Sequence, residues 1–178
     1  MALARLLVVG IVLALSALAG AAQAGTASPW IPIGCRENAQ VADPVRVDPR
    51  RYRVVAGKVA LPSSKVVQQA VRAPEGDEYP YWAKLGLLLR IGSGPVDVRL
   101  PAAWRGRATI LWGYANLHDP GAWLRLEGCP LPRVGKPWSQ WIAYAGGVSV
   151  KRPACVPLLV SAGGRTERVE LAIGRRCA

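Results

Sequence analysis

The sequence lacks phenylalanine and contains only one histidine and one methionine. A single histidine leaves few ligands for a zinc site, which usually takes several His or Cys side chains. No serine lies in a G-x-S-x-G motif, and no helical pattern follows the glycines of 91–96 to form a phosphate cradle. The most readily recognised enzyme motifs are therefore missing, and we expect no cofactor and no metal. One candidate catalytic pair remains, His118 and Asp119.

Acidic residues are also few: 11, against 23 lysines and arginines, for a net charge of +12. Such a chain is drawn to anionic surfaces such as phosphate-bearing polymers or acidic lipids. A GC-rich coding bias and simple solubility are the alternative explanation. Nucleic acid is not expected as a partner, because the basic residues do not gather on a helix. Glu75, Asp77 and Glu78 crowd one loop, but their spacing matches no calcium-loop pattern, so we favour a solvated loop over a calcium site or a glycosidase pair.

Long apolar runs are confined to the N-terminus. Arg5 precedes an uncharged segment from Leu6 to about Ala19, and Ala22-Gln23-Ala24 fits the cleavage pattern of a secretory signal peptide. This pattern predicts a signal peptide over 1–24 and export of 25–178, with a retained membrane anchor as the alternative. No later run is long enough to span a membrane.

All four cysteines lie in the part that we expect to be exported. In an oxidising compartment an even count predicts two disulfides, and four cysteines allow three connectivities. A reactive thiol is disfavoured because the chain offers one candidate base. We therefore expect structural bridges, each worth about 2–4 kcal/mol. The residues concerned are Cys35, Cys129, Cys155 and Cys177.

Helical patterns are nearly absent after the apolar N-terminus. Glycine and proline, 19 and 15 in the full chain, separate short runs rich in Val, Leu, Ile and Trp. This is typical of an all-β sandwich or barrel. We predict one disulfide-stabilised β-sandwich, Ig-like or jelly-roll, over 25–178. The expected strands are about 52–61, 65–72, 83–91, 95–100, 107–113, 122–128, 138–150, 155–161 and 165–173.

The last two strands form the best-defined hairpin. Apolar residues alternate in both, and Gly163-Gly164 between them suits a tight turn in which both residues take positive φ. That turn sets Val156 opposite Leu171 and Leu158 opposite Val169, so the apolar faces coincide.

The same register bears on the cysteines. Cys155 would face residue 172, while Cys177 lies on the order of 16 Å further along an extended strand. A bridge needs Cα atoms within about 7 Å, so joining these two would require the chain to fold back at 174–176. The pairing stays open. Pro157, which cannot donate a ladder hydrogen bond, indicates an edge strand or an unpaired amide.

Tryptophan is abundant, with seven residues beside five tyrosines. Trp112 and Trp123 lie inside apolar runs and are expected in the core, with each N–H bonded to a carbonyl. Exposed Trp and Tyr side chains would instead offer stacking surfaces for sugar rings, with arginines to pair with acidic groups. The candidate binding residues are Trp138, Trp141, Arg105 and Arg107.

Three C-terminal segments carry a resemblance. They are "PVDVRLPAAWRGRATILWG" (95–113), "LRLEGCP" (124–130) and "WIAYAGGVSVKRPACVPLLV" (141–160), followed by a closing cysteine. Through W-x-x-Y-x-G-G and P-A-C-V-P-L the chain resembles a group of small exported proteins of high-GC actinomycetes, over roughly 85–178. The resemblance implies export, a β-rich fold and structural cysteines. It brings no activity, and hence no catalytic residue.

Together these features predict a non-enzymatic exported module that binds an anionic or carbohydrate component of the cell envelope. One alternative is a secreted hydrolase centred on His118 and Asp119. Another is a β-sandwich whose loops engage a second protein, as a protease inhibitor does.

Overall fold

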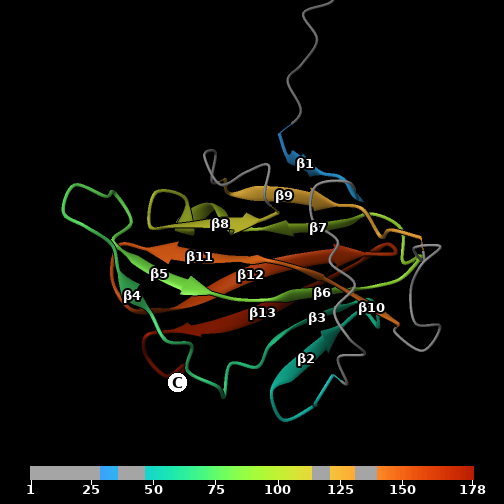
Figure 1. The fold of residues 1–178 in the computed structure, drawn as a ribbon, viewed down its shortest axis with the longest axis horizontal. Coiled ribbons are helices and arrows are strands. Elements are labelled where there is room, and N and C mark those ends of the chain that lie inside the picture. The colour runs from blue at the N-terminus through green and yellow to red at the C-terminus, as the bar shows by residue number, and fades with distance from the viewer. Residues whose placement is uncertain (1–28, 36–46, 114–120, 131–139) are drawn as a thin grey trace, which may run out of the picture.

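The computed structural model describes residues 29–35, 47–113, 121–130 and 140–178. Within them the chain forms thirteen β-strands and a short 3₁₀ turn, η2 (Ala102–Trp104), arranged in three hydrogen-bonded sheets (Figure 1). The predicted all-β class is confirmed, and the arrangement is sandwich-like.

The largest sheet has five strands. Its order is β1 (Ile31–Ile33), β9 (Trp123–Leu126), β7 (Val96–Arg99), β12 (Ala154–Ala162) and β13 (Arg165–Ile173). A second sheet contains β10 (Trp141–Tyr144), β6 (Leu87–Arg90), β3 (Val59–Pro62) and β2 (Tyr52–Val55). The third contains β4 (Val71–Arg72), β5 (Tyr81–Lys84), β11 (Gly146–Val150) and β8 (Ala108–Trp112).

The two four-stranded sheets are joined by one long antiparallel ladder. Tyr144 pairs with Leu87 in one sheet and Gly147 with Lys84 in the other, without a shift of register. Between them, the Leu85 amide donates a hydrogen bond of 2.8 Å to the Gly146 carbonyl. The expected strands 83–91 and 138–150 are therefore each interrupted once, and their pairing continues across the interruption.

Two other strand predictions need correction. The segment 52–61 is not one strand but the hairpin β2–β3, which turns at Ala56 and Gly57 with φ of 48° and 65°. The segment 65–72 is mostly irregular, with β4 at its end and an isolated bridge from Gln68 to Ile173. Strand β1 was not predicted, because three residues with a central proline are too short to show alternation.

The C-terminal hairpin β12–β13 is confirmed in register. Val156 pairs with Leu171 and Leu158 with Val169. Contrary to one reading of Pro157, β12 is an interior strand, between β7 and β13. However, β7 pairs only with the second half of β12, from Leu159 onward. The proline lies before that point, where β12 has one partner strand, so its missing N–H removes no bond to β7.

All four cysteines form disulfides. One joins Cys35 to Cys129 with Cα atoms 5.6 Å apart, and the other joins Cys155 to Cys177 at 5.1 Å. The second pairing is possible because the chain folds back after β13 at Gly174, where φ is +64°. Cys155 is thus a structural residue, as predicted, and the open question of connectivity is settled.

One hydrophobic core unites the inward faces of the three sheets. Trp112 is completely buried, and its indole N–H donates to the Leu85 carbonyl at 2.9 Å, as predicted for a core tryptophan. The largest fully buried side chains besides Trp112 are Tyr144, Ile33, Leu61, Leu85, Leu87, Leu89, Ile110, Leu124, Leu126, Ile142 and Leu158.

The buried hydroxyl of Tyr144 makes stability pH-dependent. It donates to the Glu127 carbonyl at 2.7 Å, and burial, reinforced by the nearby Glu127 charge, raises the pKa of Tyr144 to about 12. The unfolded chain ionises this group near pH 10. The unfolded state therefore binds fewer protons above pH 10, and the free energy of unfolding falls between about pH 10 and pH 12.

We expect Tyr144→Phe to flatten this alkaline loss while costing about 1 kcal/mol at neutral pH, where the hydrogen bond is lost. The measurement is urea unfolding at a series of pH values. Identical slopes for both proteins above pH 10 would show that another group titrates.

Candidate functional site

The outward side of the five-stranded sheet carries an unusual set of side chains. Along β7, Val96 and Val98 are fully buried, while Asp97 and Arg99 alternate with them and are partly exposed. Strand β9 alternates in the same way, with Trp123 and Arg125 partly exposed between fully buried leucines. The period of two thus places one set in the core and the other on a common face.

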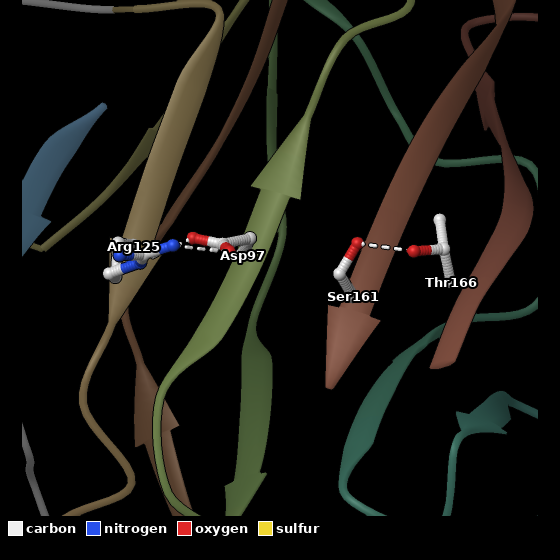
Figure 2. A network of polar contacts seen from close by, with 4 residues as sticks. All are labelled: Asp97, Arg125, Ser161 and Thr166. Atoms are coloured by element: carbon white, nitrogen blue, oxygen red, sulfur yellow. Dashed lines mark hydrogen bonds and ion pairs between the residues drawn. The ribbon is translucent and has the colours of Figure 1, made fainter. Parts of the chain in front are cut away.

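Strand register aligns this outer face into two rows across β9, β7, β12 and β13. We call these eight residues the outer face. The first row is Trp123, Arg99, Leu159 and Arg168. The second row is Arg125, Asp97, Ser161 and Thr166, drawn in Figure 2.

Indole rings and guanidinium groups pack together at the β9 side of the outer face. The rings of Trp30 and Trp123 have centroids 5.6 Å apart. The guanidinium carbon of Arg99 lies 5.2 Å from the Trp123 centroid, and that of Arg125 lies 3.7 Å from the Trp30 centroid. Such cation–π contacts attract each guanidinium to the face of a ring and restrict where it lies. Trp123 was predicted to lie in the core; that prediction is wrong, since it is half-buried on this face.

In the second row, opposite charges are matched. Arg125 makes a bidentate pair with Asp97 through bonds of 2.7 and 2.8 Å (Figure 2). The hydrogen bonds that Arg125 donates to Asp97 are the main cause that raises the pKa of the Arg125 guanidinium. Further along the row, the hydroxyls of Ser161 and Thr166 are 2.7 Å apart. In the first row Arg168 pairs with Glu170 at 3.4 Å.

Arg99 is the exception. No carboxylate among the described residues pairs with it. Its Nε and the Nε1 of Trp123 are buried N–H donors without a hydrogen-bond partner in the described part of the chain. Each donor left unpaired costs about 1–3 kcal/mol, so native proteins seldom leave two side by side without a reason. The outer face therefore carries one arginine without a carboxylate partner, and two unpaired donors are buried at this arginine and its neighbouring indole.

Of the four residues predicted as binding candidates, the three that the structure describes do not join this arrangement. Arg105 and Arg107 are exposed in the segment between η2 and β8, where the Arg107 guanidinium carbon lies 4.7 Å from the Trp104 ring centroid. Trp141 is half-buried at the start of β10, opposite Arg90. Trp138, and also His118 and Asp119 of the hydrolase alternative, lie outside the described residues.

The side chains that matter here went unnoticed in the sequence, although a signal was present. "VDVR" in β7 and "WLRL" in β9 each alternate apolar and polar or aromatic residues, which marks Asp97, Arg99, Trp123 and Arg125 as outward-facing. What the local pattern does not give is which strands are neighbours.

The described residues offer one grouping with metal-ligand chemistry, namely Cys155, Glu170 and Cys177. Both of its sulfurs are used in a disulfide, so neither is available as a thiolate ligand. The three acids of the 75–78 loop are exposed and form no such grouping. The grouping of Cys155, Glu170 and Cys177 is therefore a structural disulfide beside a carboxylate.

Among the described residues, two cavities of similar size open on different sheets. One, of about 590 Å³, lies on the third sheet, with Trp82, Leu111 and Val71 among its mostly apolar lining. The other, of about 570 Å³, adjoins the second row of the outer face, and the charged side chains of Asp97 and Lys58 belong to its lining. Asp97 lies two positions before Arg99 on β7, so this second cavity lies near the unmatched arginine.

Comparison with known proteins leaves the function to be argued from these residues. No protein-family model matches the chain, and no curated protein matches it. In the described part of the chain, no helix has the length and apolar character needed to cross a bilayer. The outer face supplies the most specific chemical feature among the described residues.

Proposed function

We propose that the protein is an exported, non-enzymatic module that binds an anionic polymer of the cell envelope at the Arg99 and Trp123 end of its outer face. The observation that carries this proposal is the Arg99 guanidinium, whose carbon lies 5.2 Å from the Trp123 ring centroid and which lacks any carboxylate partner among the described residues. A guanidinium is planar, and its N–H groups match the geometry of a carboxylate or phosphate group. The net charge of +12 draws such a polymer to the protein.

Export is part of the proposal and has separate support. The apolar segment before Ala22-Gln23-Ala24 has the pattern of a cleaved signal, and both disulfides suit an oxidising compartment. Intact-mass measurement of protein recovered from the culture medium tests it directly. We expect a mature chain that begins at Gly25, and recovery of uncleaved chain from the cytosol would contradict export.

Substitution of Arg99 tests the binding face. We expect Arg99→Gln to weaken binding to polygalacturonate or polyphosphate by about tenfold or more, because a charged hydrogen bond is worth roughly 1.5–3 kcal/mol. Arg99→Lys keeps the charge but loses the planar fork, so we expect an intermediate affinity. Isothermal titration calorimetry at low and high salt gives the measurement, and binding should fall as salt rises.

The matched control is Arg168→Gln. Arg168 lies in the same row of the outer face, but it is exposed and already paired with Glu170. An exposed pair contributes little, so this variant should bind nearly as well as the wild type. Equal losses of affinity in the two variants would show that binding depends on net charge and not on Arg99 in particular. A wild-type protein that binds neither anionic polymer would refute the proposal.

A further inference from the structure

The second row of the outer face leads into the cavity of about 570 Å³ near the β12–β13 turn. Asp97, Ser161 and Thr166 belong to both the row and the cavity lining, and Lys58 enters from the turn between β2 and β3. Figure 2 shows the row, with Arg125 directed at Asp97 and the Ser161 hydroxyl directed at Thr166.

The polar groups in this cavity are held by hydrogen bonds, but each has hydrogen-bonding capacity left for a ligand. Both oxygens of Asp97 accept a bond from Arg125, yet each carboxylate oxygen has a second lone pair. Of the two hydroxyls 2.7 Å apart, one donates to the other, so one O–H remains to donate to a ligand. The Lys58 ammonium donates to the Ser93 carbonyl at 3.0 Å and has two further hydrogens.

The hairpin turn makes room for the lysine. Gly163 has φ of +56°, and a Cβ at this position would lie 2.8 Å from the Lys58 Nζ. A larger residue would therefore push the ammonium away as well as strain the turn. The double glycine thus shapes the cavity in addition to closing the hairpin.

This mixture of groups discriminates between ligands. The charge of Asp97 is matched by Arg125, and its remaining lone pairs accept hydrogen bonds, which a hydroxyl group can donate and an ionised phosphate or carboxylate cannot. Acceptors, a hydroxyl donor and an ammonium side by side match the hydroxyl groups of a neutral polyol. Asp97 precedes Arg99 by two positions on β7, roughly 6.6–7 Å along the strand.

From this juxtaposition we infer that the ligand is an acidic carbohydrate. Its anionic group binds Arg99, and the hydroxyls of a neighbouring sugar unit bind in the cavity at Asp97, Ser161, Thr166 and Lys58. The inference rests on the proposed function and narrows its anionic polymer to a polysaccharide, in preference to polyphosphate or a phospholipid surface.

The test compares two anions on one pair of variants. The double variant Ser161→Ala/Thr166→Val removes both hydroxyls from exposed or half-buried positions and keeps their approximate shapes. We expect it to bind a short oligogalacturonate about tenfold more weakly than the wild type and to bind polyphosphate of equal charge unchanged. Ser149→Ala, which removes a hydroxyl from the lining of the other cavity, is the matched control and should change neither affinity.

The outcomes separate the two proposals. The carbohydrate inference is overturned if the double variant binds oligogalacturonate as tightly as the wild type does. It is also overturned if the variant loses affinity for oligogalacturonate and polyphosphate by the same factor. If the wild type binds polyphosphate through Arg99 but does not bind oligogalacturonate, the inference fails while the anion-binding function stands. If Arg99→Gln changes neither affinity, the proposed function itself fails. An unchanged thermal midpoint in each variant confirms that the fold is intact.

Discussion

Replacing Gly147 with alanine is expected to destabilise the protein by about 3 kcal/mol or more, the upper end of what overpacking costs. Gly147 lies in β11, where the strand runs between β5 and β8. A Cβ at this position would be 2.0 Å from the Ala83 carbonyl oxygen and 2.8 Å from the Trp82 ring. Backbone oxygen cannot move aside as a flexible side chain can, so the sheet itself has to separate.

The measurement is urea or thermal unfolding beside the control Gly86→Ala. Gly86 interrupts the partner strand, and a Cβ there meets nothing within 4 Å. Since this alanine only restricts the unfolded chain, its effect should be small or stabilising by up to about 1 kcal/mol. For a domain of this size, 3 kcal/mol corresponds to a midpoint lowered by about 6–12 °C. Equal stability of the two variants would contradict the close approach of β5 and β11.

Removing the Cys35–Cys129 disulfide is expected to cost more than removing the Cys155–Cys177 disulfide. The first spans 94 residues of sequence and the second 22. In the chain-entropy description a bridge restricts the unfolded state more when its loop is longer, which gives about 4.7 kcal/mol for the first and about 3 kcal/mol for the second. The long bridge is the one that ties the region of β1 to the segment after β9.

The double variants Cys35→Ala/Cys129→Ala and Cys155→Ala/Cys177→Ala compare the two bridges without leaving a free thiol. Denaturant unfolding should give the larger loss for the first. Peptide mapping of the unreduced wild type should recover the same two pairs. A reversed order of stability would mean that the unfolded chain already holds β1 near β9, and a different pairing would refute the described connectivity.

The parts of the fold that could be predicted are those fixed by neighbours in the sequence. The β12–β13 hairpin follows from two alternating runs and a double-glycine turn, Gly163-Gly164, and its register was obtained residue by residue. By contrast, the apolar run "LGLLLRI" contains no signal for the break at Leu85-Gly86. The single strand expected over 83–91 is therefore two strands, β5 and β6.

The pairing of the cysteines lies between these cases. The register excluded a bridge from Cys155 to Cys177 on an extended strand, and it identified the segment after Ile173 as the place where the chain would have to fold back. Whether it does so depends on contacts from elsewhere. The Gly174 amide donates to the Gln68 carbonyl, a residue more than a hundred positions away in sequence.

The candidate site was missed because its members come from three distant segments. Trp30, Arg99 and Trp123 meet only through the parallel pairing of β1 with β9 and the antiparallel pairing of β9 with β7. The sequence analysis also combined tryptophan with arginine, but it named Arg105 and Arg107, which lie in the segment between η2 and β8 and not on the outer face. Local alternation reveals which face a residue occupies, and long-range pairing decides which residues share that face.

The most direct measurement is an NMR titration of the oxidised protein with oligogalacturonate, observing indole and guanidinium N–H resonances. If an anionic carbohydrate binds the outer face at Arg99, the Nε1–H of Trp123 and the Nε–H of Arg99 should shift most, because they belong to the guanidinium that binds the anion and to the ring beside it. The Nε1–H resonance of the buried Trp112, which already donates to the Leu85 carbonyl, should not shift. Largest shifts at Trp82 in the apolar cavity, or no shift at the outer face, would contradict the site.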